Sequence, residues 1–355
     1  MIVGQAKYFL DQGYAVTVCC QKLSRGGHSA LSGVPNQSMS KPTRMVLTAG
    51  MRNRLYVERV SRLRRSKGGL LVDHGQFFAD ADMSYVHNFL ASQYSSRIPG
   101  YLTEKNFPGS IQRGETLLVA NSHMVRQALL EQFKFPDSKV VVEYPGHNAD
   151  RFSPDLRQWR RAKLRKKLRI DDGQPVVGLV TSGHFEKRGL DRFLDCVSEL
   201  RTQHPGLRAL ILGGKHPPRA LHAHHLYKSG EVLYRTSSFV PEDFFAALDL
   251  FLYPARYEEF GIVVLEAMAM GIPVVTSTAV GASELLAAAS DQLVIIAAGD
   301  DVASYCQRAT DILGLSETDK KALSSALCRV AKDHTHTAHN RRIQSYIDRL
   351  SERRR

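Results

Sequence analysis

Short apolar runs alternate with longer amphipathic segments along the whole chain. The runs are rich in Val, Leu and Ile, and most end in Gly, Ser, Asn or Pro, which is typical of buried parallel strands followed by helices. The runs that predict strands are 14–20, 70–75, 83–88, 116–122, 139–146, 175–183, 207–214, 250–255 and 272–278. The pattern therefore predicts an α/β protein with parallel sheets.

A basic segment, residues 151–172, separates these strands into two groups. We therefore expect two doubly wound, Rossmann-like domains that face a central cleft, with ligands bound where strands end and helices begin. The expected organisation is an N-terminal domain over 1–150, the interdomain segment 151–172, a C-terminal domain over 173–335, and a basic C-terminal helix over 336–355 that packs back on the N-terminal domain.

The first thirteen residues predict a helix rather than a strand. Ala6, Phe9 and Leu10 form an apolar face, Gly13 suits the helix end, and strand 14–20 follows. A doubly wound domain begins with a strand and a glycine-rich turn before its first helix. We therefore expect the N-terminal domain to lack its first strand, and a functional chain to start roughly 15–30 residues upstream of Met1. The alternative is that strand 14–20 shifts inward.

Composition agrees with two ordinary domains. The chain has 355 residues, of which 43% are hydrophobic, which is enough for two cores. Its five cysteines are scattered and show no CxxC or Cys/His ligand spacing, so neither a disulfide framework nor a zinc site is expected, and a reducing cytoplasm fits. No segment has the pattern of a signal peptide or of a membrane span.

Positive charge is concentrated in two stretches of a chain whose net charge is +13. Residues 52–67 hold seven Lys and Arg against one Glu, and residues 157–169 hold eight with no acidic residue. Such stretches can form solvated helix faces, or they can bind an anionic membrane surface, an anionic substrate or nucleic acid. Because no nucleic-acid-binding motif accompanies the charge, we expect no nucleic-acid partner.

One carboxylate, Glu266, interrupts an apolar helical run over 262–270. The helix is expected to start at Gly261 or Ile262, where its free N–H groups and partial positive charge suit a phosphate. Glu266 then lies roughly 6–7 Å along the axis, which is similar to the step from a nucleotide's phosphate to its ribose. Sugar hydroxyls are suitable donors to such a carboxylate, and an unpaired one would be costly to bury.

The sequence "EEFGIVVLE" followed by "AMAMGIPVVTS" resembles the signature of the retaining nucleotide-sugar glycosyltransferases of GT-B fold, family 4, also called glycosyl transferases group 1. The hallmark of that family is Glu, seven residues, Glu. Other stretches that resemble the family are 119–133, 140–155, 181–196 and 239–261. The loop Lys187-Arg188-Gly189 and "PGHNADRF" (145–152) bring the chain nearest to the lipopolysaccharide-core glucosyltransferase branch.

The resemblance implies a role for each matching residue. Glu258 would contact hydroxyls of the donor sugar, and His87 would face its reacting carbon. Lys187 and Arg188 would clamp the pyrophosphate. The implied catalytic set is Glu258, His87, Lys187 and Arg188, and the implied donor-binding set is Glu266 at the ribose, Phe260 and Gly261 through backbone N–H groups, Ile262 and Gly183.

The resemblance also implies the reaction. A hexose would move from a nucleotide sugar, UDP-glucose or similar, to a hydroxyl of a cell-envelope glycan or lipid-linked acceptor, with retained configuration. Fixed cations and the helix N-terminus can stabilise the leaving phosphate, so neither a metal nor another cofactor is expected. The enzyme would lie in the cytoplasm, peripheral on the cytoplasmic face of an anionic inner membrane. The alternatives are a sugar-nucleotide-binding protein impaired in catalysis and a nucleotide-sugar epimerase of the same fold.

Several further residues have a structural alternative. Lys187 and Arg188 could be surface charge, although cations are unfavourable at a helix N-terminus. His74 and His87 could be hydrogen-bonded loop residues. The remaining candidates are Asn121 and Ser122, expected to cap a helix, Gly281 and Glu284, expected at a turn into a helix near the donor phosphate, and 80–82, "DAD", which resembles the metal motif of the GT-A fold but lacks flanking ligands and is rejected.

Overall fold

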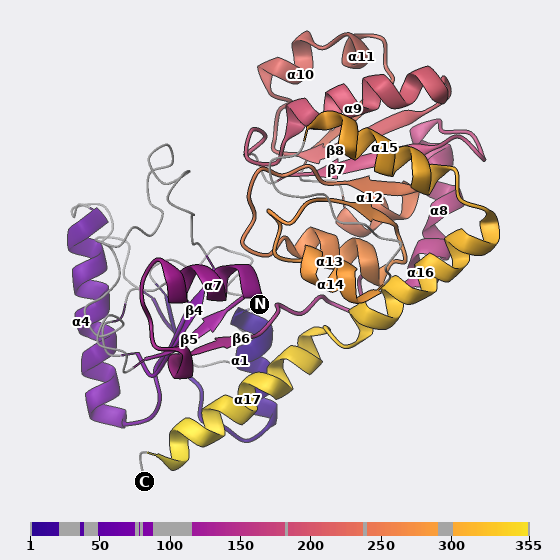
Figure 1. The fold of residues 1–355 in the computed structure, drawn as a ribbon. Coiled ribbons are helices and arrows are strands. Elements are labelled where there is room, and N and C mark those ends of the chain that lie inside the picture. The colour runs from indigo at the N-terminus through magenta and orange to yellow at the C-terminus, as the bar shows by residue number, and fades with distance from the viewer. Residues whose placement is uncertain are drawn as a thin grey trace. The chain divides into compact units, whose positions relative to one another are not determined.

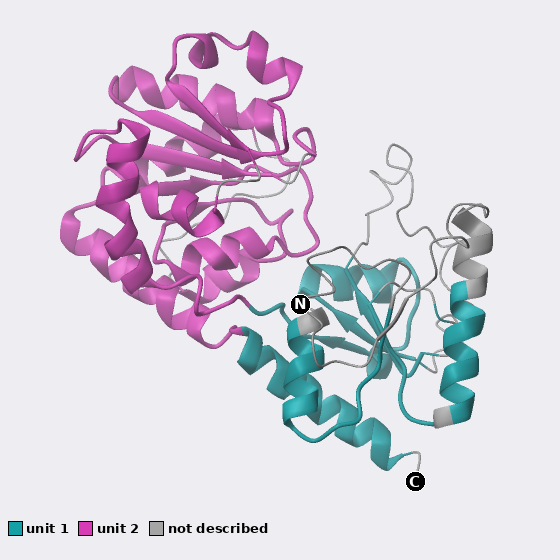
Figure 2. Ribbon diagram, turned by 180° about the vertical axis from the view of Figure 1, so that it is seen from behind, with its two compact units in different colours: residues 1–146, 336–355 teal, residues 147–335 magenta. Residues whose placement is uncertain are grey.

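The computed structural model describes residues 2–20, 36–38, 49–74, 78, 81–87, 116–181, 184–236, 240–289 and 301–353. The chain divides into two compact units (Figure 2). Unit 1 comprises residues 1–146 and 336–355, and unit 2 comprises residues 147–335. Each unit contains parallel sheet of its own, so the predicted α/β class is confirmed.

Unit 2 is built on a five-stranded parallel sheet, in the order β11-β10-β7-β8-β9, with helices on both faces (Figure 1). Its strands are β7 (Val176–Val180), β8 (Arg208–Gly213), β9 (Val232–Thr236), β10 (Leu250–Leu252) and β11 (Val274–Val275). Its helices are α8 (Pro154–Leu168), α9 (Leu190–Gln203), α10 (Arg219–Ala223), α11 (His225–Lys228), α12 (Pro241–Ala247), α13 (Ile262–Ala269), α14 (Ser283–Ala289), α15 (Val302–Leu313) and α16 (Glu317–Lys332).

Unit 1 contains a four-stranded parallel sheet, in the order β3-β4-β5-β6, and a parallel pair, β1-β2. The strands are β1 (Val18–Cys20), β2 (Asn36–Ser38), β3 (Val72–Asp73), β4 (Met83–Val86), β5 (Leu117–Ala120) and β6 (Val140–Val142). The helices are α1 (Ile2–Asp11), α4 (Ala49–Lys67), α7 (His123–Glu131), the 3-10 turn η2 (Asp137–Lys139) and α17 (His336–Glu352).

Every predicted strand segment contains an observed strand, whereas β2 and β9 were missed. The β9 strand lies at the edge of its sheet, and four of its five residues are only partly buried. An edge strand lacks the continuous apolar run by which central strands are found. The β2 strand, Asn-Gln-Ser, is polar throughout, so only its pairing with β1 identifies it.

Helix α17, from the end of the chain, belongs to unit 1. The Tyr8 hydroxyl on α1 donates to Gln344 Oε1 at 2.8 Å. Glu143, just after β6, accepts from Arg342 Nε at 2.8 Å and from the Tyr346 hydroxyl at 3.1 Å. These contacts join the end of the chain to the first helix and to the last strand of the sheet.

The predicted interdomain segment 151–172 lies in unit 2, because most of it is α8, which packs on α12. Arg161 and Arg165 on the inner face of α8 both pair with Asp249, at the start of β10. Arg157 donates to the carbonyl oxygens of Leu248 at 3.0 Å and Gly271 at 3.2 Å. These arginines satisfy carbonyls that α12 leaves without partners at its end, so α8 is part of the domain rather than a linker.

The other basic stretch, 52–67, forms most of α4 in unit 1. Arg64 pairs with the half-buried Asp82 at 2.9 Å, while Arg62 pairs with Glu58 on the exposed face at 3.5 Å. Neither α4 nor any other helix among the described residues is long and apolar enough to cross a membrane.

Replacing Arg165 with Leu should lower the free energy of unfolding of unit 2 by about 3 kcal/mol, because it removes one partner of a buried charge network. Only 2% of the Arg165 side chain is exposed, and it also donates to the carbonyl oxygens of Ala247 at 3.1 Å and Asp171 at 2.8 Å. Urea unfolding followed by circular dichroism measures the loss. The substitution Lys166→Leu, at an exposed position of the same helix, should change the free energy of unfolding by less than about 0.5 kcal/mol. Equal losses in the two variants would show that the buried contacts of Arg165 do not stabilise unit 2.

Candidate functional site

The site begins where the loop after β10 turns into α13. Gly261 is the N-cap of α13, with φ of 87°, so the predicted start at Gly261 or Ile262 is confirmed. A Cβ at this position would lie 3.0 Å from Cγ1 of Val280 and 3.2 Å from Cγ of Glu258. Both the positive φ and the close neighbours favour glycine, which lets the loop approach the first turn of the helix closely.

Backbone hydrogen bonds hold the loop before α13 against the segment before α14. Glu258 donates its N–H to the carbonyl of Ala279 at 2.9 Å and accepts from the N–H of Gly281 at 3.0 Å. The Phe260 carbonyl accepts from the N–H of Ala282 at 2.7 Å. Glu258 and Phe260 therefore stand on backbone that is fixed on both sides, which is what a preorganised site needs.

A second loop, residues 184–189, is braced against the first. Arg256 donates its backbone N–H to the carbonyl of Lys187 at 2.9 Å, and its side chain to the carbonyl of Glu186 at 2.7 Å. Gly189 has φ of 68°, and a Cβ there would lie 2.0 Å from the carbonyl oxygen of Pro254. No larger residue fits between the two loops without moving one of them.

The two loops bring four charges together. Lys187 Nζ lies 3.1 Å from Glu259 Oε2 and 3.8 Å from Glu258 Oε2, and Arg188 forms an ion pair with Glu258. None of these side chains is more than 14% exposed. Two cations and two carboxylates are thus balanced in a partly desolvated cluster, where charge interactions are stronger than in water.

Burial and pairing act against each other on Glu259. Burial raises the pKa of the Glu259 carboxyl above its usual value, and the neighbouring Lys187 lowers it. Aromatic rings complete the surroundings, since Lys187 Nζ lies 5.6 Å from the centroid of Tyr257 and Arg188 Cζ lies 5.9 Å from that of Tyr253. Tyr257 and Tyr253 are themselves buried, so the rings limit the access of water to both cations.

Glu266 lies one turn into α13 and is half-buried. Its carboxylate has no hydrogen bond or ion pair with any residue that the structure describes. Burial raises its pKa to about 8, and the nearby Arg151 lowers it only in part. Arg151 is already committed to Glu242, with contacts of 2.5 and 2.8 Å. Glu266 therefore has no partner among the described residues, which leaves its carboxylate available to a ligand.

In unit 1, His87 follows β4 and His74 follows β3, at the carboxyl ends of neighbouring strands. Their rings and that of Tyr85 are nearly parallel, with centroids 4.2 Å apart for His74 and Tyr85 and 5.2 Å for Tyr85 and His87. Burial lowers the pKa of His87 to about 4 and that of His74 to about 3, so both are neutral at pH 7.

The hydrogen bonds of the two histidines differ. His74 Nε2 lies 2.9 Å from Gln5 Oε1, and Gln5 donates to the Tyr85 hydroxyl at 2.8 Å. The buried Nε2 of His87 has no hydrogen-bond partner among the described residues. His74 is thus hydrogen-bonded through Nε2, as the structural alternative expects, although its buried Nδ1, like Nε2 of His87, has no partner among the described residues.

The remaining candidates divide between structural and untested roles. Ser122 caps α7 by accepting from Val125 N–H at 3.1 Å, while Asn121 Oδ1 is buried without a described partner. Asp82 accepts from the N–H of Leu71 at 2.7 Å, which with its Arg64 pair gives it a structural role. Gly281 and Glu284 lie at the turn into α14. Gly183 and Asp80 lie outside the described residues.

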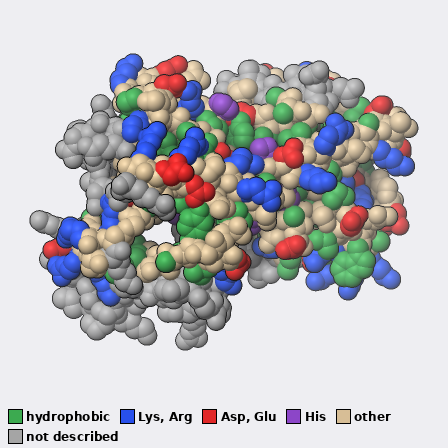
Figure 3. Space-filling model, turned by 90° about the horizontal axis from the view of Figure 1, so that it is seen from below, with side chains coloured by type: hydrophobic (Ala, Val, Ile, Leu, Met, Phe, Trp, Pro, Cys, Tyr) green, Lys and Arg blue, Asp and Glu red, His purple; other side chains and the backbone are tan. Residues whose placement is uncertain are grey.

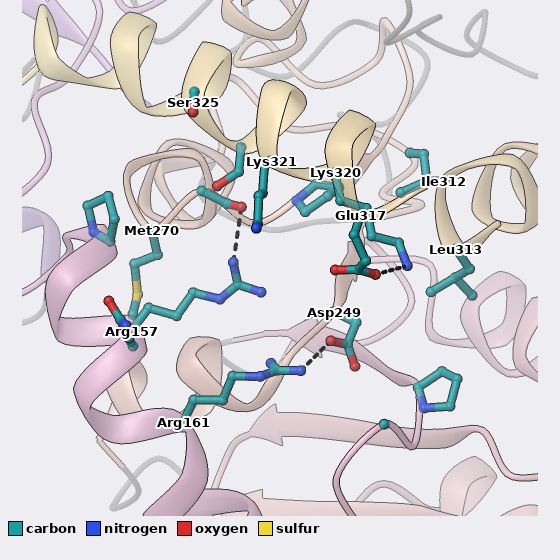
Figure 4. A pocket seen from close by; sticks show the side chains of 17 residues that line it. Arg157, Arg161, Asp249, Met270, Ile312, Leu313, Glu317, Lys320, Lys321 and Ser325 are labelled. Carbon is teal, nitrogen blue, oxygen red and sulfur yellow. Dashed lines mark hydrogen bonds and ion pairs between the residues drawn. The ribbon is translucent and has the colours of Figure 1, made fainter. Parts of the chain in front are cut away.

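A cavity of about 760 Å³ lies elsewhere in unit 2, between α8 and α16 (Figure 4). Arg157 and Arg161 point into it from α8, and Lys320, Lys321 and Glu317 from α16. None of the predicted site residues is among its described lining. Because both arginines already bind backbone carbonyls or Asp249, we interpret this cavity as a crevice between packed helices.

Three residues were missed as parts of the site. Glu259 binds Lys187, Arg256 braces the 184–189 loop, and Gly189 lets that loop pass Pro254. The sequence did show Glu258 and Glu259 as two adjacent carboxylates. Since only Glu258 was assigned a role, Glu259 was left without an expected partner. Nothing local to Arg256 or Gly189 indicates their contacts, since these are made across 65 residues of chain or more.

Residues 174–314 match the model of a protein family described as Glycosyl transferases group 1. The lipopolysaccharide core biosynthesis mannosyltransferase LpsB of Rhizobium meliloti (strain 1021) is 28% identical over 227 residues, 60% of this chain and 62% of LpsB. The D-inositol 3-phosphate glycosyltransferase of Corynebacterium jeikeium (strain K411) is 31% identical over 45% of this chain and 41% of its own. The chain thus spans less than two thirds of these curated relatives.

Solved structures match nearly the whole chain. WaaG, a glycosyltransferase involved in lipopolysaccharide biosynthesis, has a TM-score of 0.75 at 18% identity, with 98% of this chain and 94% of WaaG covered. Anabaena Alr3699/HepE in complex with UDP-glucose has a TM-score of 0.72 at 19% identity, with the same coverage. At this identity the similarity establishes the fold, which is the two-domain GT-B fold of these glycosyltransferases.

The raised pKa of Glu266 predicts a stability that depends on pH. The folded chain holds this proton up to about pH 8, whereas the unfolded carboxyl loses it near 4.5, so stability falls as pH rises through that window. Glu266→Gln should remove this loss and be more stable than the parent by about 1–2 kcal/mol at pH 8.5, a figure discounted for partial exposure. The two should melt alike at pH 5.

Thermal melts of both proteins at several pH values test this. Glu317→Gln, whose side chain is 81% exposed on α16, is the matched control and should follow the parent throughout. A parent whose melting temperature is as pH-independent as that of Glu266→Gln would show that the Glu266 carboxyl has an ordinary pKa.

Proposed function

We propose that this chain, whose residues 174–314 form a glycosyl transferases group 1 domain, is a hexosyltransferase. It transfers a hexose from a nucleotide sugar, UDP-glucose or similar, to a hydroxyl of a cell-envelope glycan or lipid-linked acceptor, with retained configuration. The observation that carries the proposal is the charge cluster at the start of α13, with Glu266 one turn further on and without a partner in the part of the chain that the structure describes.

The cations support the departure of the nucleotide. Breaking the bond between the sugar and the diphosphate leaves negative charge on the phosphate oxygen, which fixed positive groups stabilise. Lys187 and Arg188 stand on a loop braced by Arg256, and the N-terminus of α13 adds the positive end of its dipole. Because Glu258 and Glu259 neutralise both cations in the absence of donor, the pyrophosphate would share them with these carboxylates.

Glu266 supports nucleotide recognition. Its position, about 6 Å into α13, matches the distance from a phosphate at the helix N-terminus to a ribose. Two ribose hydroxyls can donate to one carboxylate, and such charge-assisted hydrogen bonds are stronger than neutral ones. The pKa of the Glu266 carboxyl is raised in the protein without ligand. This is consistent with a carboxylate whose hydrogen-bond donors are supplied by the ligand.

Glu258 and His87 would act on the sugar. The carboxylate of Glu258, held by its ion pair with Arg188 and by backbone bonds on both sides, would accept from sugar hydroxyls. His87 is neutral, so its unused Nε2 can donate to or accept from a hydroxyl close to the reacting carbon. Neither role needs a metal, because Lys187, Arg188 and the helix end supply the positive charge. Activity that persists in EDTA would support metal independence.

The acceptor and the location belong to the same proposal. LpsB is named for lipopolysaccharide core biosynthesis and WaaG for lipopolysaccharide biosynthesis, so an envelope glycan or glycolipid is the acceptor class we favour. Such acceptors are assembled at a membrane, and the net charge of +13 would hold the enzyme at an anionic surface, on the cytoplasmic face of the inner membrane.

The deciding experiment is a donor screen. UDP- and GDP-sugars are tested for binding by thermal shift, and those that bind are tested for release of the nucleoside diphosphate with and without a lipopolysaccharide-core acceptor. Turnover with one donor supports the transferase. Binding without turnover would favour a sugar-nucleotide-binding protein, and interconversion of two sugars on the nucleotide would favour an epimerase.

Glu266→Ala should weaken binding of the nucleoside diphosphate about 10- to 100-fold, because it removes two hydrogen bonds to a charged group. Glu258→Gln should leave that binding within about threefold and lower turnover at least about 100-fold, since its contacts form with the sugar. Calorimetry and a nucleotide-release assay measure the two effects. The ribose assignment fails if Glu266→Ala binds as tightly as the parent, and unaltered turnover in Glu258→Gln removes Glu258 from the catalytic set.

The double variant Lys187→Ala, Arg188→Ala should weaken the nucleoside diphosphate at least about tenfold more than the bare nucleoside, because only the former carries the pyrophosphate. Circular dichroism controls for the loss of the three ion pairs with Glu258 and Glu259. Arg192→Ala, a basic residue nearby on α9, is the matched control and should bind both ligands like the parent. Equal losses for the two ligands would favour the surface-charge interpretation.

A further inference from the structure

Helix α8 has two faces of different chemistry. Its inner arginines bind α12 and the start of β10 through Asp243 and Asp249. Its outer face exposes Trp159, Lys163, Lys166 and Lys167, which lie at i, i+4, i+7 and i+8 and therefore on one side of the helix. Among the described residues, none forms an ion pair or hydrogen bond with the Lys163 or Lys166 side chain.

Trp159 is the feature that needs explanation. It is the only tryptophan of the chain, and 72% of it is exposed. The other exposed large hydrophobic residue among those described, Val240 at 43%, lies just before α12. Asp243, on the first turn of α12, pairs with Arg160, the neighbour of Trp159. The two exposed hydrophobic residues therefore belong to neighbouring elements, Trp159 to α8 and Val240 to the start of α12. An indole ring left in water beside lysines is typical of a helix that lies at a lipid interface.

The geometry points to the outer face of α8, formed by Trp159, Lys163, Lys166 and Lys167, as a docking surface for an anionic lipid bilayer. The indole would enter the headgroup region while the lysine amines contact anionic headgroups, with their stems lying along the surface. This inference rests on the proposed function and names the part of the chain that meets the membrane.

Charge alone does not select this face. Figure 3 shows Lys and Arg side chains spread over the surface that it draws, and α4 carries a basic stretch of its own. On the described part of α4, however, Tyr56 is 8% exposed and packs in a hydrophobic cluster, so no aromatic ring accompanies the exposed arginines. Nucleic acid is also the weaker partner, because no nucleic-acid-binding motif accompanies the charge in the sequence.

The attachment of α8 makes docking relevant to the site. Arg161 and Arg165 join the helix to Asp249, directly before β10, and β10 leads into the loop that carries Glu258. A membrane that binds α8 would therefore orient all of unit 2 through packed, ion-paired elements rather than through a flexible tether.

The single tryptophan provides the assay. The full chain is mixed with vesicles of phosphatidylglycerol and phosphatidylcholine, or of phosphatidylcholine alone, from 50 to about 500 mM NaCl. We expect a blue shift of tryptophan emission and co-flotation with the anionic vesicles only, both weakening with salt. Since each lysine near the surface contributes about fivefold in partitioning, Lys163→Glu, Lys166→Glu, Lys167→Glu should weaken binding more than about 100-fold. Trp159→Ala should weaken flotation without abolishing its salt dependence.

A triple variant on α4 is the matched control. Arg59→Glu, Arg62→Glu, Arg65→Glu makes the same change in net charge at exposed positions of unit 1 and should keep most of the flotation and the full blue shift. The proposal is overturned by an equal loss in both triple variants, by equal binding to both kinds of vesicle, by an unshifted emission on bound vesicles, or by a shift that duplex DNA produces and vesicles do not.

Nucleotide release with a soluble acceptor separates this proposal from the function. Both triple variants should release the nucleoside diphosphate like the parent, because none of the six substituted residues belongs to the charge cluster or to α13. Normal release without vesicle binding would reject the docking face alone. Vesicle binding by a chain that turns over no donor would reject the enzymatic proposal and leave the docking face standing.

Discussion

Two clusters of ion pairs, each made of basic side chains and carboxylates, hold the segment from Asp249 to Gly261 in place. At its start, Arg161 and Arg165 pair with Asp249, and at its end Lys187 and Arg188 pair with Glu258 and Glu259. Between them lies β10, a buried interior strand of the unit 2 sheet. Removing one partner from either cluster would leave an uncompensated charge in a partly desolvated place, so both ends of the segment are strongly constrained.

This constraint gives the candidate site its shape. The loop before α13 has little freedom, because its backbone is hydrogen-bonded to residues 279–282. In addition, Arg256 of this loop donates hydrogen bonds to the carbonyls of residues 186 and 187. Gly261 and Gly189 allow approaches that a Cβ would prevent. Groups held in this way need no reorganisation when charge develops on a ligand, which is the condition for strong electrostatic stabilisation. The same rigidity connects the site to α8 and hence to the proposed docking face.

Several polar groups lack a partner among the described residues, and Glu266 and His87 are the two that the proposed function uses. The carboxylate of Glu266 and the Nε2 of His87 have no partner in the described part of the chain, and burial shifts the pKa of both groups toward the neutral form. Buried polar groups in folded proteins are normally satisfied, so each exception requires an explanation. Under the proposed function, hydroxyl groups of the substrates would supply the missing donors or acceptors, while in their absence each group lowers the stability of the fold.

The sequence by itself determined all strands of the two larger sheets except β9, together with the start of α13 and the candidate residues around it. Those features depend on local rules: continuous apolar runs for buried parallel strands, and a glycine before an apolar helix. Where the pattern was mixed or polar, as in β9 and β2, the strand was missed, because pairing with a neighbour rather than local hydrophobicity makes it a strand.

Only the tertiary structure decided what each charge does. The stretch 157–169 was visible as one basic run, yet Arg157, Arg161 and Arg165 turn inward to carbonyls and Asp249 while its lysines and Trp159 face water. In the same way, Lys187 acquires Glu259 as a partner from 72 residues away, and Glu266 acquires none among the residues described. A charge pattern records which residues are ionised, but the free energy of each depends on the groups that folding brings within a few ångströms.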